Sequence, residues 1–473
     1  MPNVTPERLE RRSLRQLLQG DPAKAEVAAR KLIERSPQCA SGWAALKGAL
    51  TARGLPADAD ALRGCLASPP SAAAEGPIDL LASRRLSRRG LIFDPAEPVP
   101  LRRMAARLAQ VRTAADLRET DNAVWFADRG GEWVERDPVL DLGDAAGPPV
   151  PVRYATAPKF LASIRNAAVV GEGLALTEAG EFLEELHPPF KASKYAARRQ
   201  GDELMFEPAP RGRGQLSVKA FDTPAFLMAG PTDTSFGDFL VNFAPRLSLY
   251  EAAGLDCPIL VRWKPLPQVL SILEALGFGA DRVIFHTTDQ ISLFPKLFVS
   301  CWPSENKAAP VAGVFDIYRR ASLAPTADRP LLYLDRRHVR PRPLANEEQV
   351  CELFAARGFQ IVNPGNLTFE QTRRLFANPA CVAGPFGSAF HNLVFSGNHP
   401  TSLVLIPAHM PYKLVEIAQW QADLGNRFAY VTGKMPAEPH NTRTPWTVSL
   451  DKLDRALDRM MQLVQSSQVA LAG

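Results

Sequence analysis

The stretch LLYLDRRHVRPRPLANEEQVCELFAARGFQIVNP, residues 331–364, shows the pattern that decides the fold. An apolar run, LLYL, leads into a basic loop, a helical pattern and a second apolar run, FQIV. The same alternation continues through ACVA, SLVLIP and FAYV, with helical patterns between most of these runs. Short strands that are apolar on both sides and joined by helices predict a parallel sheet covered on both faces.

Length and composition predict a globular protein of two or three domains. The 473 residues exceed one ordinary domain, and 46% hydrophobic with 22% charged residues is enough for sizeable cores. The six scattered cysteines include no C-x-x-C pair, so we expect them to be reduced. The net charge of +5 permits an anionic partner. Basic and aromatic residues do not interleave as in a strand-binding groove, so no nucleic-acid partner is expected.

The sequence also bears on location. No apolar run reaches the roughly 18 residues that a membrane span needs. The N-terminal MPNVTPERLERRSLRQ is charged throughout and lacks the apolar core of a secretory signal. We therefore expect a cytoplasmic protein, and peripheral association with the inner membrane is left open.

Residues 1–67 carry a helical pattern in which small and large apolar residues alternate over helix pairs. The pattern resembles a tetratricopeptide-type unit. A simple three-helix cap explains it equally well, because tetratricopeptide arrays usually need three repeats for stability. If the first interpretation holds, these helices would bind a protein partner or acceptor.

The rest of the chain divides into three segments. Residues 68–120 are predicted to be linker and helices, beginning with SPPSAAAEGP and including the basic run SRRLSRRG. Residues 121–325 are predicted to form a lobe of β-hairpins followed by α/β structure. One hairpin is expected at Gly130–Gly131 and another within VVGEGLALTEAGEF. Residues 326–473 are predicted to form a C-terminal α/β lobe.

Two predicted strand ends carry residues suited to an anion, and open parallel sheets bind ligands beyond the carboxyl ends of their strands. After LLYL, Arg336 and Arg342 lie in one loop with two further arginines, and guanidinium groups bind phosphate bidentately. Taken alone, a solvated basic loop is the favoured interpretation. Asn346, next to Glu347, has Gln349 three residues on, which is the form of a capping box.

The second strand end is the turn in CVAGPFGSAFHNLVF, residues 381–395. Gly384 and Gly387 let backbone approach a ligand closely, and a helix starting at Ser388 offers unpaired N–H groups. Glycines at such a turn would equally serve its geometry alone. His391 is interpreted most simply as a satisfied helix residue, and Asn392 as a partner of turn backbone.

A third stretch, FGDFLVNFAPRL, holds Asp238, Asn242 and Arg246 one helical turn apart and therefore on one face. A carboxylate at the mouth of a cleft can act as a general base. Without further context, a surface Asp near a helix start is favoured. The sequence contains no Walker loop, G-x-S-x-G elbow or H-E-x-x-H motif, and no metal site is expected.

Together these stretches resemble glycosyltransferase family 61, whose members are inverting, nucleotide-sugar-dependent enzymes with the two-domain GT-B fold. FGDFLVNFAPRL resembles the family's G-H-F-L-x-E-x-L-P-R-L element, and residues 331–364 resemble its Y-I-S-R…R-x-x-x-N-E-x-E…G-F run. LTFEQTRRLFANPACVAGPFGSAFHNLVF resembles the L-S-x-x-E-Q…G-x-H-G-A-x-x-x-N-L-x-F signature. The likeness covers roughly residues 160 to 465.

The resemblance implies an α/β, GT-B-like fold of two Rossmann-like domains, here preceded by the small all-α N-terminal region. It implies a donor-binding set in the C-terminal lobe: Arg336, Arg342, Asn346, Glu347, Gly384, Gly387, Ser388, His391 and Asn392. Asp238 is the expected catalytic base. Asn242 and Arg246 are assigned to the acceptor side or to structure.

Four positions depart from the family pattern. Asp238 and Phe386 stand where the family usually has His, Asp335 replaces a serine, and Asn242 lies near a replaced Glu. The loss of two imidazoles leaves three interpretations open: an altered donor, a base moved to Asp238, or lost catalysis.

The expected function is an inverting, metal-independent glycosyltransferase that needs no cofactor beyond its nucleotide-sugar co-substrate. By the resemblance, the acceptor would be a glycan or lipid-linked hydroxyl in cell-surface polysaccharide biosynthesis, such as a capsule. One alternative is a protein O-glycosyltransferase that uses the N-terminal helices to bind its acceptor. The other is a non-catalytic glycan-assembly scaffold that keeps the fold.

Overall fold

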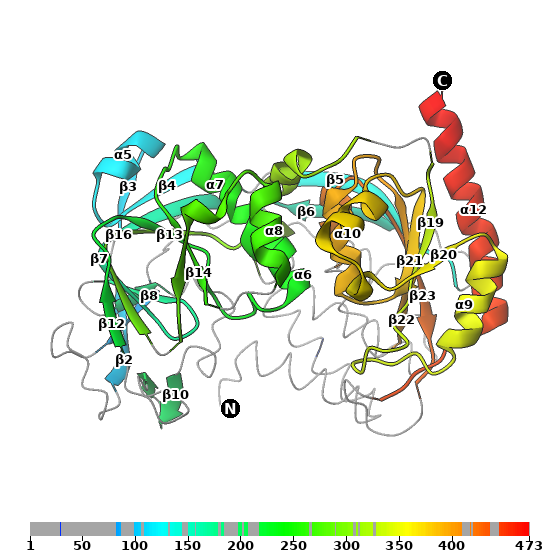
Figure 1. Cartoon of the computed structure of the whole chain (residues 1–473), viewed down its shortest axis with the longest axis horizontal. Coiled ribbons are helices and arrows are strands. Elements are labelled where there is room, and N and C mark those ends of the chain that lie inside the picture. Colours follow the sequence, from blue (N-terminus) through cyan, green and yellow to red (C-terminus); the bar gives the residue numbers. More distant parts are fainter. Residues whose placement is uncertain are drawn as a thin grey trace. The chain divides into compact units, whose positions relative to one another are not determined.

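The structure is a computed structural model of the whole chain, drawn in Figure 1. The residues that it describes are 29, 82–86, 99–105, 108–130, 133–143, 150–156, 158–177, 181–183, 197–200, 203–206, 217–263, 267–288, 290–305, 309–310, 313–324, 328–408, 417, 420–435 and 444–472. The predicted helical region 1–67 lies outside them, apart from Ala29. Cys39 and Cys65 also lie outside, and the four described cysteines are free.

The chain divides into two compact units. One, called here the C-terminal unit, comprises Met1–Ala74, Glu132–Thr156 and Ser322–Gly473. The other, called here the central unit, comprises Glu75–Gly131 and Ala157–Ala321. Each is described by itself.

The C-terminal unit contains the parallel sheet that the sequence predicts. Its strands lie in the order β20 (Gln360–Val362), β19 (Leu331–Leu334), β21 (Cys381–Pro385), β22 (Thr401–Pro407), β23 (Arg427–Gly433), β5 (Trp133–Asp141) and β6 (Val150–Ala155). All neighbours are parallel except β5 and β6, which are antiparallel. Among the strands after residue 330, β19 comes first in sequence but lies between β20 and β21 in the sheet. That order is the doubly wound one whose switch point lies between β19 and β21.

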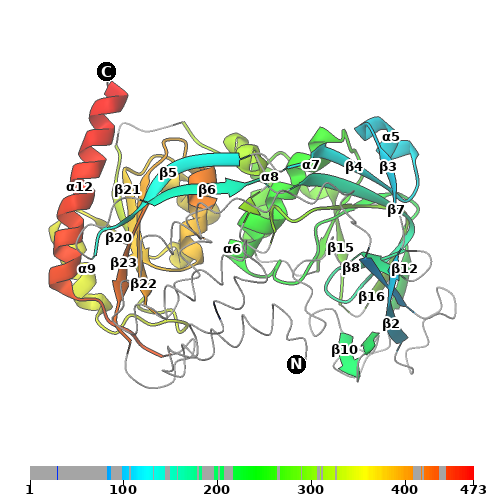
Figure 2. The ribbon, with the colours of Figure 1, turned by 180° about the vertical axis from the view of Figure 1, so that it is seen from behind.

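Both faces of this sheet are covered, as strands buried on both sides require. Helices α9 (Glu347–Ala356) and α12 (Leu450–Ala472) lie on one face, and α10 (Phe369–Phe376) lies on the other (Figures 1 and 2). Alternate strand residues, such as Tyr333, Ala383 and Leu403, form one buried cluster with Phe354 of α9 and Leu457 of α12. This core fixes the two loops that follow β19 and β21.

The central unit is built on a second, mixed sheet. Its order is β15 (Val283–His286), β14 (Ile259–Arg262), β13 (Ala225–Leu227), β16 (Gln290–Ser300), β7 (Lys159–Val170), β4 (Ala123–Asp128) and β3 (Ala109–Val111). Strand β12 (Ser217–Ala220) pairs with β16, and β8 (Leu174–Leu176) pairs with β7. Helices α5 (Ala114–Glu119), α7 (Leu247–Ala252) and α8 (Pro267–Ala275) belong to the same unit. Short strands β17 (Ser304–Glu305) and β18 (Ala309–Pro310) form a separate pair.

One of the two predicted hairpins is confirmed and the other is wrong. Strands β7 and β8 form an antiparallel hairpin whose turn holds Gly171 and Gly173, both at positive φ. The segments on either side of Gly130–Gly131 do not pair: β4 lies in the central sheet, whereas β5 pairs with β6 and β23. Alternation predicts a strand but does not identify its partner. Here β5 pairs with β6, the next strand in sequence, and with β23, some 290 residues away.

The basic run SRRLSRRG was predicted to be helical, and that prediction is wrong for its first half. Ala82–Leu86 is strand β1, which pairs with β2 (Val99–Ala105) and β9 (Glu181–Leu183). Strands β10 (Ala197–Gln200) and β11 (Glu203–Phe206) complete this five-stranded sheet. Pairing with strands distant in sequence outweighs a local propensity that is worth only tenths of a kcal/mol per residue, about 0.7 at most.

Candidate functional site

The loops after β19 and β21 meet at the switch point of the C-terminal sheet. The two strands pair in parallel, with Tyr333 opposite Ala383, so their carboxyl ends lie at one edge. The guanidinium of Arg336 lies against the backbone of Gly387, because a Cβ built on that glycine would stand 2.8 Å from the Arg336 Cζ. The structure therefore brings together an arginine and a glycine that the sequence predicted at two separate strand ends.

Arg336 is a buried cation, 8% exposed. Its Nη2 donates to the carbonyl oxygen of Pro341 at 3.1 Å, and its backbone N–H donates to Oε1 of Glu347 at 2.7 Å. Its buried Nε has no hydrogen-bond partner among the described residues. Burial and the nearby charge of Arg342 lower the pKa of Arg336 to about 10. An anion placed here would satisfy the Nε donor and offset the repulsion between the two guanidiniums.

Both the backbone and the guanidinium of Arg342 make contacts. Its backbone adopts φ 57°, and its carbonyl oxygen accepts a hydrogen bond of 3.1 Å from Nε1 of Trp446. Its guanidinium lies over the ring of Phe386, with Cζ 5.0 Å from the ring centroid. That distance is within the range of a cation–π interaction.

Two carboxylates near Arg336 do little to neutralise it. Asp335 forms a bidentate ion pair with Arg337, whose Nε donates to Oδ1 at 3.1 Å and whose Nη2 donates to Oδ2 at 3.0 Å. Burial raises the pKa of Asp335, but hydrogen bonds from Arg337 outweigh this effect and leave it below its ordinary value. Burial raises the pKa of Glu347 to about 7, so its negative charge is only partly present at neutral pH. The edge of the sheet therefore favours an anionic ligand.

Asn346 and Glu347, which the resemblance placed on the donor side, both bond within the protein. The side chain of Asn346 donates to the carbonyl oxygen of Val448 at 2.8 Å and accepts from its N–H at 3.2 Å. It makes no cap bond to α9, so the capping box is wrong. Pairing with a chain segment about 100 residues away satisfies the amide instead. Glu347 holds the Arg336 backbone.

The turn after β21 uses its two glycines differently. Gly384 has φ +151°, and a Cβ there would meet the carbonyl oxygen of Leu334 at 2.9 Å, so β-sheet geometry alone requires glycine. Gly387 has an ordinary extended φ of −176° but leaves room for the guanidinium of Arg336. Exposed Ser388 then begins η8 (Ser388–Phe395), so the predicted helix starts where expected, and it is a 3-10 helix.

The later residues of η8 pack inward. Asn392 is buried, and its Nδ2 donates to the carbonyl oxygen of Ala389 at 3.0 Å, in agreement with the local-backbone interpretation. The ring of His391 lies 5.0 Å from that of Trp420. Packing and local hydrogen bonds thus account for much of the environment of both side chains.

Asp238 lies in the central unit, in an irregular helical segment. α6 (Phe236–Asp238) runs into a π-helical turn, η3 (Phe239–Phe243), then a 3-10 turn, η4 (Ala244–Arg246), and then α7. Pro245 lacks an N–H and would clash with a preceding carbonyl in a regular helix, which explains the change of winding. Nδ2 of Asn242 lies 3.4 Å from Oδ1 of Asp238 and helps to fix the carboxylate.

Arg246 has a packing role. It is 2% exposed, and its Nε donates to the carbonyl oxygen of Asn242 at 2.8 Å. Its guanidinium packs on the rings of Phe243 and Trp302, 4.5 and 4.3 Å from their centroids. It therefore braces the segment that carries Asp238.

Comparison with known families bears on both loops and on this helical segment. Residues 236–404 match the family Glycosyltransferase 61. The matched stretch begins at α6 and ends within β22, so it contains Asp238 and the edge formed by β19 and β21. It supports the resemblance and, with it, glycosyltransferase activity. No curated protein matches the chain.

Sequence reasoning missed a second arginine at a strand end. Arg262, the last residue of β14, pairs with Asp233 at 2.8 Å and donates to the carbonyl oxygen of Gly230 at 2.7 Å. Glu172 lies 3.5 Å away. Burial raises the pKa of Asp233 to about 6. The pair anchors the loop that leads into α6, and its only signal in the sequence is an arginine that closes the apolar run PILV.

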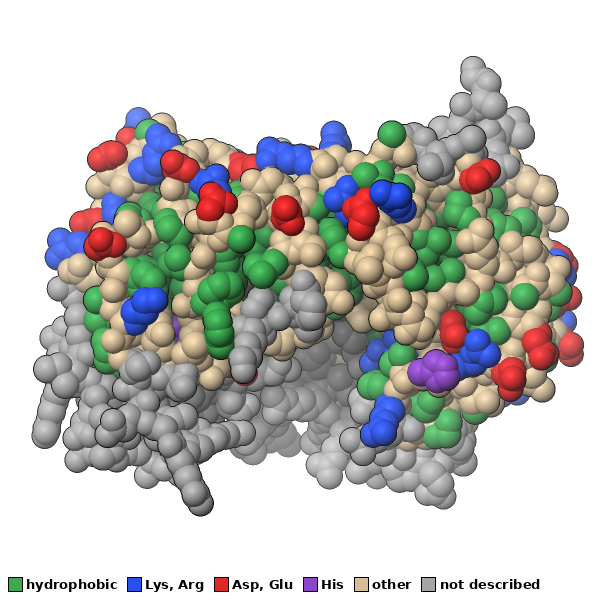
Figure 3. Space-filling model, viewed as in Figure 1, with side chains coloured by type: hydrophobic (Ala, Val, Ile, Leu, Met, Phe, Trp, Pro, Cys, Tyr) green, Lys and Arg blue, Asp and Glu red, His purple; other side chains and the backbone are tan. Residues whose placement is uncertain are grey.

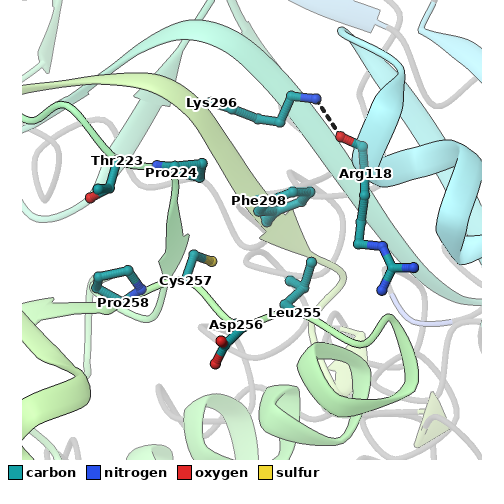
Figure 4. Close-up of a pocket in the computed structure, with 9 residues that line it drawn as sticks. All are labelled: Arg118, Thr223, Pro224, Leu255, Asp256, Cys257, Pro258, Lys296 and Phe298. Atoms are coloured by element: carbon teal, nitrogen blue, oxygen red, sulfur yellow. Dashed lines mark hydrogen bonds between the residues drawn. The ribbon is translucent and has the colours of Figure 1, made fainter.

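The central unit also contains an open pocket of about 440 Å³, shown in Figure 4. Phe298 and Leu255 form apolar walls, beside residues that directly precede β13 and β14. Its two cations are already engaged: Arg118 donates to the carbonyl oxygens of Ala253 and Gly254, and Lys296 donates to that of Arg118 at 2.7 Å. The pocket therefore differs from the β19–β21 edge, where a buried guanidinium keeps an unsatisfied donor.

On the face drawn in Figure 3, lysines and arginines alternate with acidic side chains. Within the described ranges, no group of His, Cys, Asp and Glu could hold a metal ion. Of the helices in those ranges, none is long and apolar enough to cross a membrane.

Proposed function

We propose that this protein transfers a sugar from a nucleotide-sugar donor, and that the donor's diphosphate binds where β19 and β21 end. The observation that carries the proposal is the environment of Arg336. A buried guanidinium lies against the backbone of Gly387, keeps an unsatisfied Nε, and has a second guanidinium, that of Arg342, nearby. A diphosphate presents several anionic oxygens at the spacing that two guanidiniums can share.

In the proposed reaction the configuration at the sugar is inverted. The acceptor hydroxyl oxygen bonds to the anomeric carbon as the bond from that carbon to the diphosphate oxygen breaks. The bonding electron pair leaves on the nucleoside diphosphate, where Arg336 and Arg342 stabilise the growing charge. The hydroxyl proton passes to the carboxylate of Asp238, which Asn242 orients.

Charge neutralisation by guanidiniums makes this proposal metal-independent. Transfer should proceed at an unchanged rate in EDTA, because the arginines take the part that a divalent cation takes in other phosphate sites. A rate that collapses in EDTA and returns with Mg²⁺ or Mn²⁺ would contradict this part of the proposal and leave the transferase assignment in place.

The proposed acceptor is the one that the resemblance implies, a glycan or lipid-linked hydroxyl of cell-surface polysaccharide biosynthesis. A protein acceptor is the alternative, which depends on residues 1–67, outside the described part of the chain. Deleting those residues and measuring transfer to a glycan acceptor and to a protein acceptor separates the two, because only the second needs a protein-binding region.

A thermal-shift panel of nucleoside diphosphates and nucleotide sugars tests the donor site. A true donor at about 100 times its Kd should raise the free energy of unfolding by about 2.7 kcal/mol. Arg336→Ala should abolish the shift, whereas Arg340→Ala, which removes an exposed arginine of the same loop, should leave it unchanged. If no nucleotide stabilises the wild-type chain, a non-catalytic scaffold explains the absence of histidine at positions 238 and 386 better than an active enzyme does.

A further inference from the structure

We infer that Phe386 is a positioning residue whose ring holds the guanidinium of Arg342 ready for the anion that Arg336 also faces. The inference depends on the proposed donor site and goes beyond it. It gives a function to a residue that stands where the resemblance expects histidine.

The ring of Phe386 is itself fixed by the sheet. Its backbone N–H donates to the carbonyl oxygen of Leu405 at 2.8 Å, which extends the pairing of β21 with β22 by one residue. Phe386 is half-buried, directly before Gly387. The aromatic ring is therefore attached to the hydrogen-bonded sheet of the C-terminal unit, next to the glycine on which Arg336 lies.

Arg342 is fixed from the other direction by its backbone. A non-glycine residue at φ 57° is unusual and is retained only where its surroundings hold it. Here Nε1 of Trp446 holds the carbonyl oxygen at 3.1 Å. The backbone of Arg342 is thus anchored by Trp446, and its guanidinium, 5.0 Å from the ring centroid, is anchored by Phe386.

An uncharged ring suits this position better than an acid or an imidazole. The face of a phenyl ring attracts a cation through its quadrupole and adds no net charge. A carboxylate would neutralise Arg342 and compete with the ligand, and a protonated imidazole would repel it. Phe386 thus orients the guanidinium without weakening its attraction for a diphosphate.

Isothermal titration of the full chain with pyrophosphate and with UDP, without divalent ions, tests the inference. Phe386→Leu should weaken binding by about five- to tenfold, because the guanidinium of Arg342 then loses the ring face that orients it. Phe386→Tyr, which keeps the ring, should restore affinity to within about twofold of wild type. Phe126→Leu is the matched control, since it removes a ring 5.1 Å from Arg129 in the central unit, and it should have no effect.

Two further measurements separate positioning from a general structural effect. In an Arg342→Ala background, Phe386→Leu should cause no additional loss, since the ring acts through that arginine. Phe386→His should bind like Phe386→Tyr at pH 8 and more weakly at pH 5.5, where the imidazole is charged. All other titratable groups, including Asp335, Glu347 and the ligand itself, are the same in both variants, so the difference between the two at each pH isolates residue 386.

The outcomes also separate this inference from the proposed function. If Phe386→Leu binds pyrophosphate as tightly as wild type, or loses the same factor with Arg342 absent, the positioning role is wrong and the donor site stands. If the Arg342→Ala variant binds pyrophosphate as tightly as wild type, Arg342 does not contact the ligand and the positioning role of Phe386 is wrong. If the wild-type chain binds neither pyrophosphate nor any nucleoside diphosphate, the proposed function fails. A Phe386→Leu chain that does not fold leaves the Tyr and His variants to decide.

Discussion

The two units each place an arginine at the carboxyl end of a parallel strand, and the surroundings of those arginines differ. In the central unit, Arg262 closes β14 and pairs with Asp233 at 2.8 Å, with Glu172 at 3.5 Å. In the C-terminal unit, Arg336 follows β19, bonds to a carbonyl, and keeps a buried Nε without a partner among the described residues. The same residue type at the same topological position is a structural brace in one unit and a candidate anion site in the other.

The neighbouring groups sharpen this contrast. In the central unit, both ring nitrogens of buried His286 are engaged, with Ser292 and with the carbonyl oxygen of Gly171, each at 2.9 Å. In the C-terminal unit, a second cation, Arg342, lies close enough to lower the pKa of Arg336. A position at a strand end therefore does not by itself identify a ligand site; the balance of charge around that position does.

The largest effect is expected at Asp238, the proposed general base in the central unit. Asp238→Asn should lower kcat by about 10²–10⁴-fold, because an amide cannot accept the hydroxyl proton. The Kd for UDP should stay unchanged. Asp222→Asn, an exposed change in the same unit, is the control and should alter neither quantity. A variant at Asp238 that keeps full kcat would require another base.

Next in size is the cost of breaking the central brace. Arg262→Ala should lower the free energy of unfolding by about 3 kcal/mol, since it leaves the buried carboxylate of Asp233 without its partner. Chemical denaturation measures the loss. Arg165→Ala, which breaks an exposed pair with Asp121, should cost less than about 0.5 kcal/mol. Should Arg262→Ala instead weaken pyrophosphate binding with little loss of stability, the division between brace and site would be wrong.

A smaller effect concerns the turn on which Arg336 lies. Gly387→Ala should displace the guanidinium, because a Cβ at that position overlaps it, and should weaken pyrophosphate binding by about tenfold. Stability should change little, since φ is extended and any residue can adopt it. Gly397→Ala, where a Cβ meets nothing within 4 Å, is the control in the same unit. Equal affinity for both variants would mean that Arg336 does not need its place against the turn.

The smallest expected effect comes from Glu347 and is a matter of pH. Its folded pKa, about 7, lies above the ordinary value of a glutamate, so the folded state binds the extra proton. The stability contributed by this proton is complete at about pH 4 and is lost as pH rises toward 7. Glu347→Gln should remove this trend, which we expect to be worth about 1–2 kcal/mol in the free energy of unfolding. Urea denaturation at pH 5 and at pH 7.5 measures it.

Much of the C-terminal unit was predictable because its signals are local. Apolar runs such as SLVLIP become strands buried along their whole length, and the helices between them cover both faces. Two strand ends with arginines and glycines were therefore predicted at one edge, and the parallel pairing of β19 and β21 brings them together. In the same unit, the predicted capping box at Asn346 was wrong because the side chain of Asn346 hydrogen-bonds to a segment about 100 residues away.

Predictions that depended on distant partners fared worse. The hairpin at Gly130–Gly131 was expected from two alternating segments, yet β4 and β5 belong to different sheets. The Arg262–Asp233 pair and the cation–π contact of Arg342 with Phe386 join residues 29 and 44 positions apart, and no spacing rule links them. A local pattern reports which face of an element is apolar and says nothing of what will pack against it.

The alternation of strands and helices after residue 330 follows from the amino-acid sequence alone, because burial on both faces requires continuous apolar runs. The sequence also placed arginines and glycines at two strand ends. Which of these groups are satisfied by other parts of the chain depends on the folded arrangement. The physical reason is that electrostatic interaction depends on the distance in space between residues that are far apart in sequence. A charge with an opposite charge close by is neutralised, and one without such a neighbour can attract a ligand.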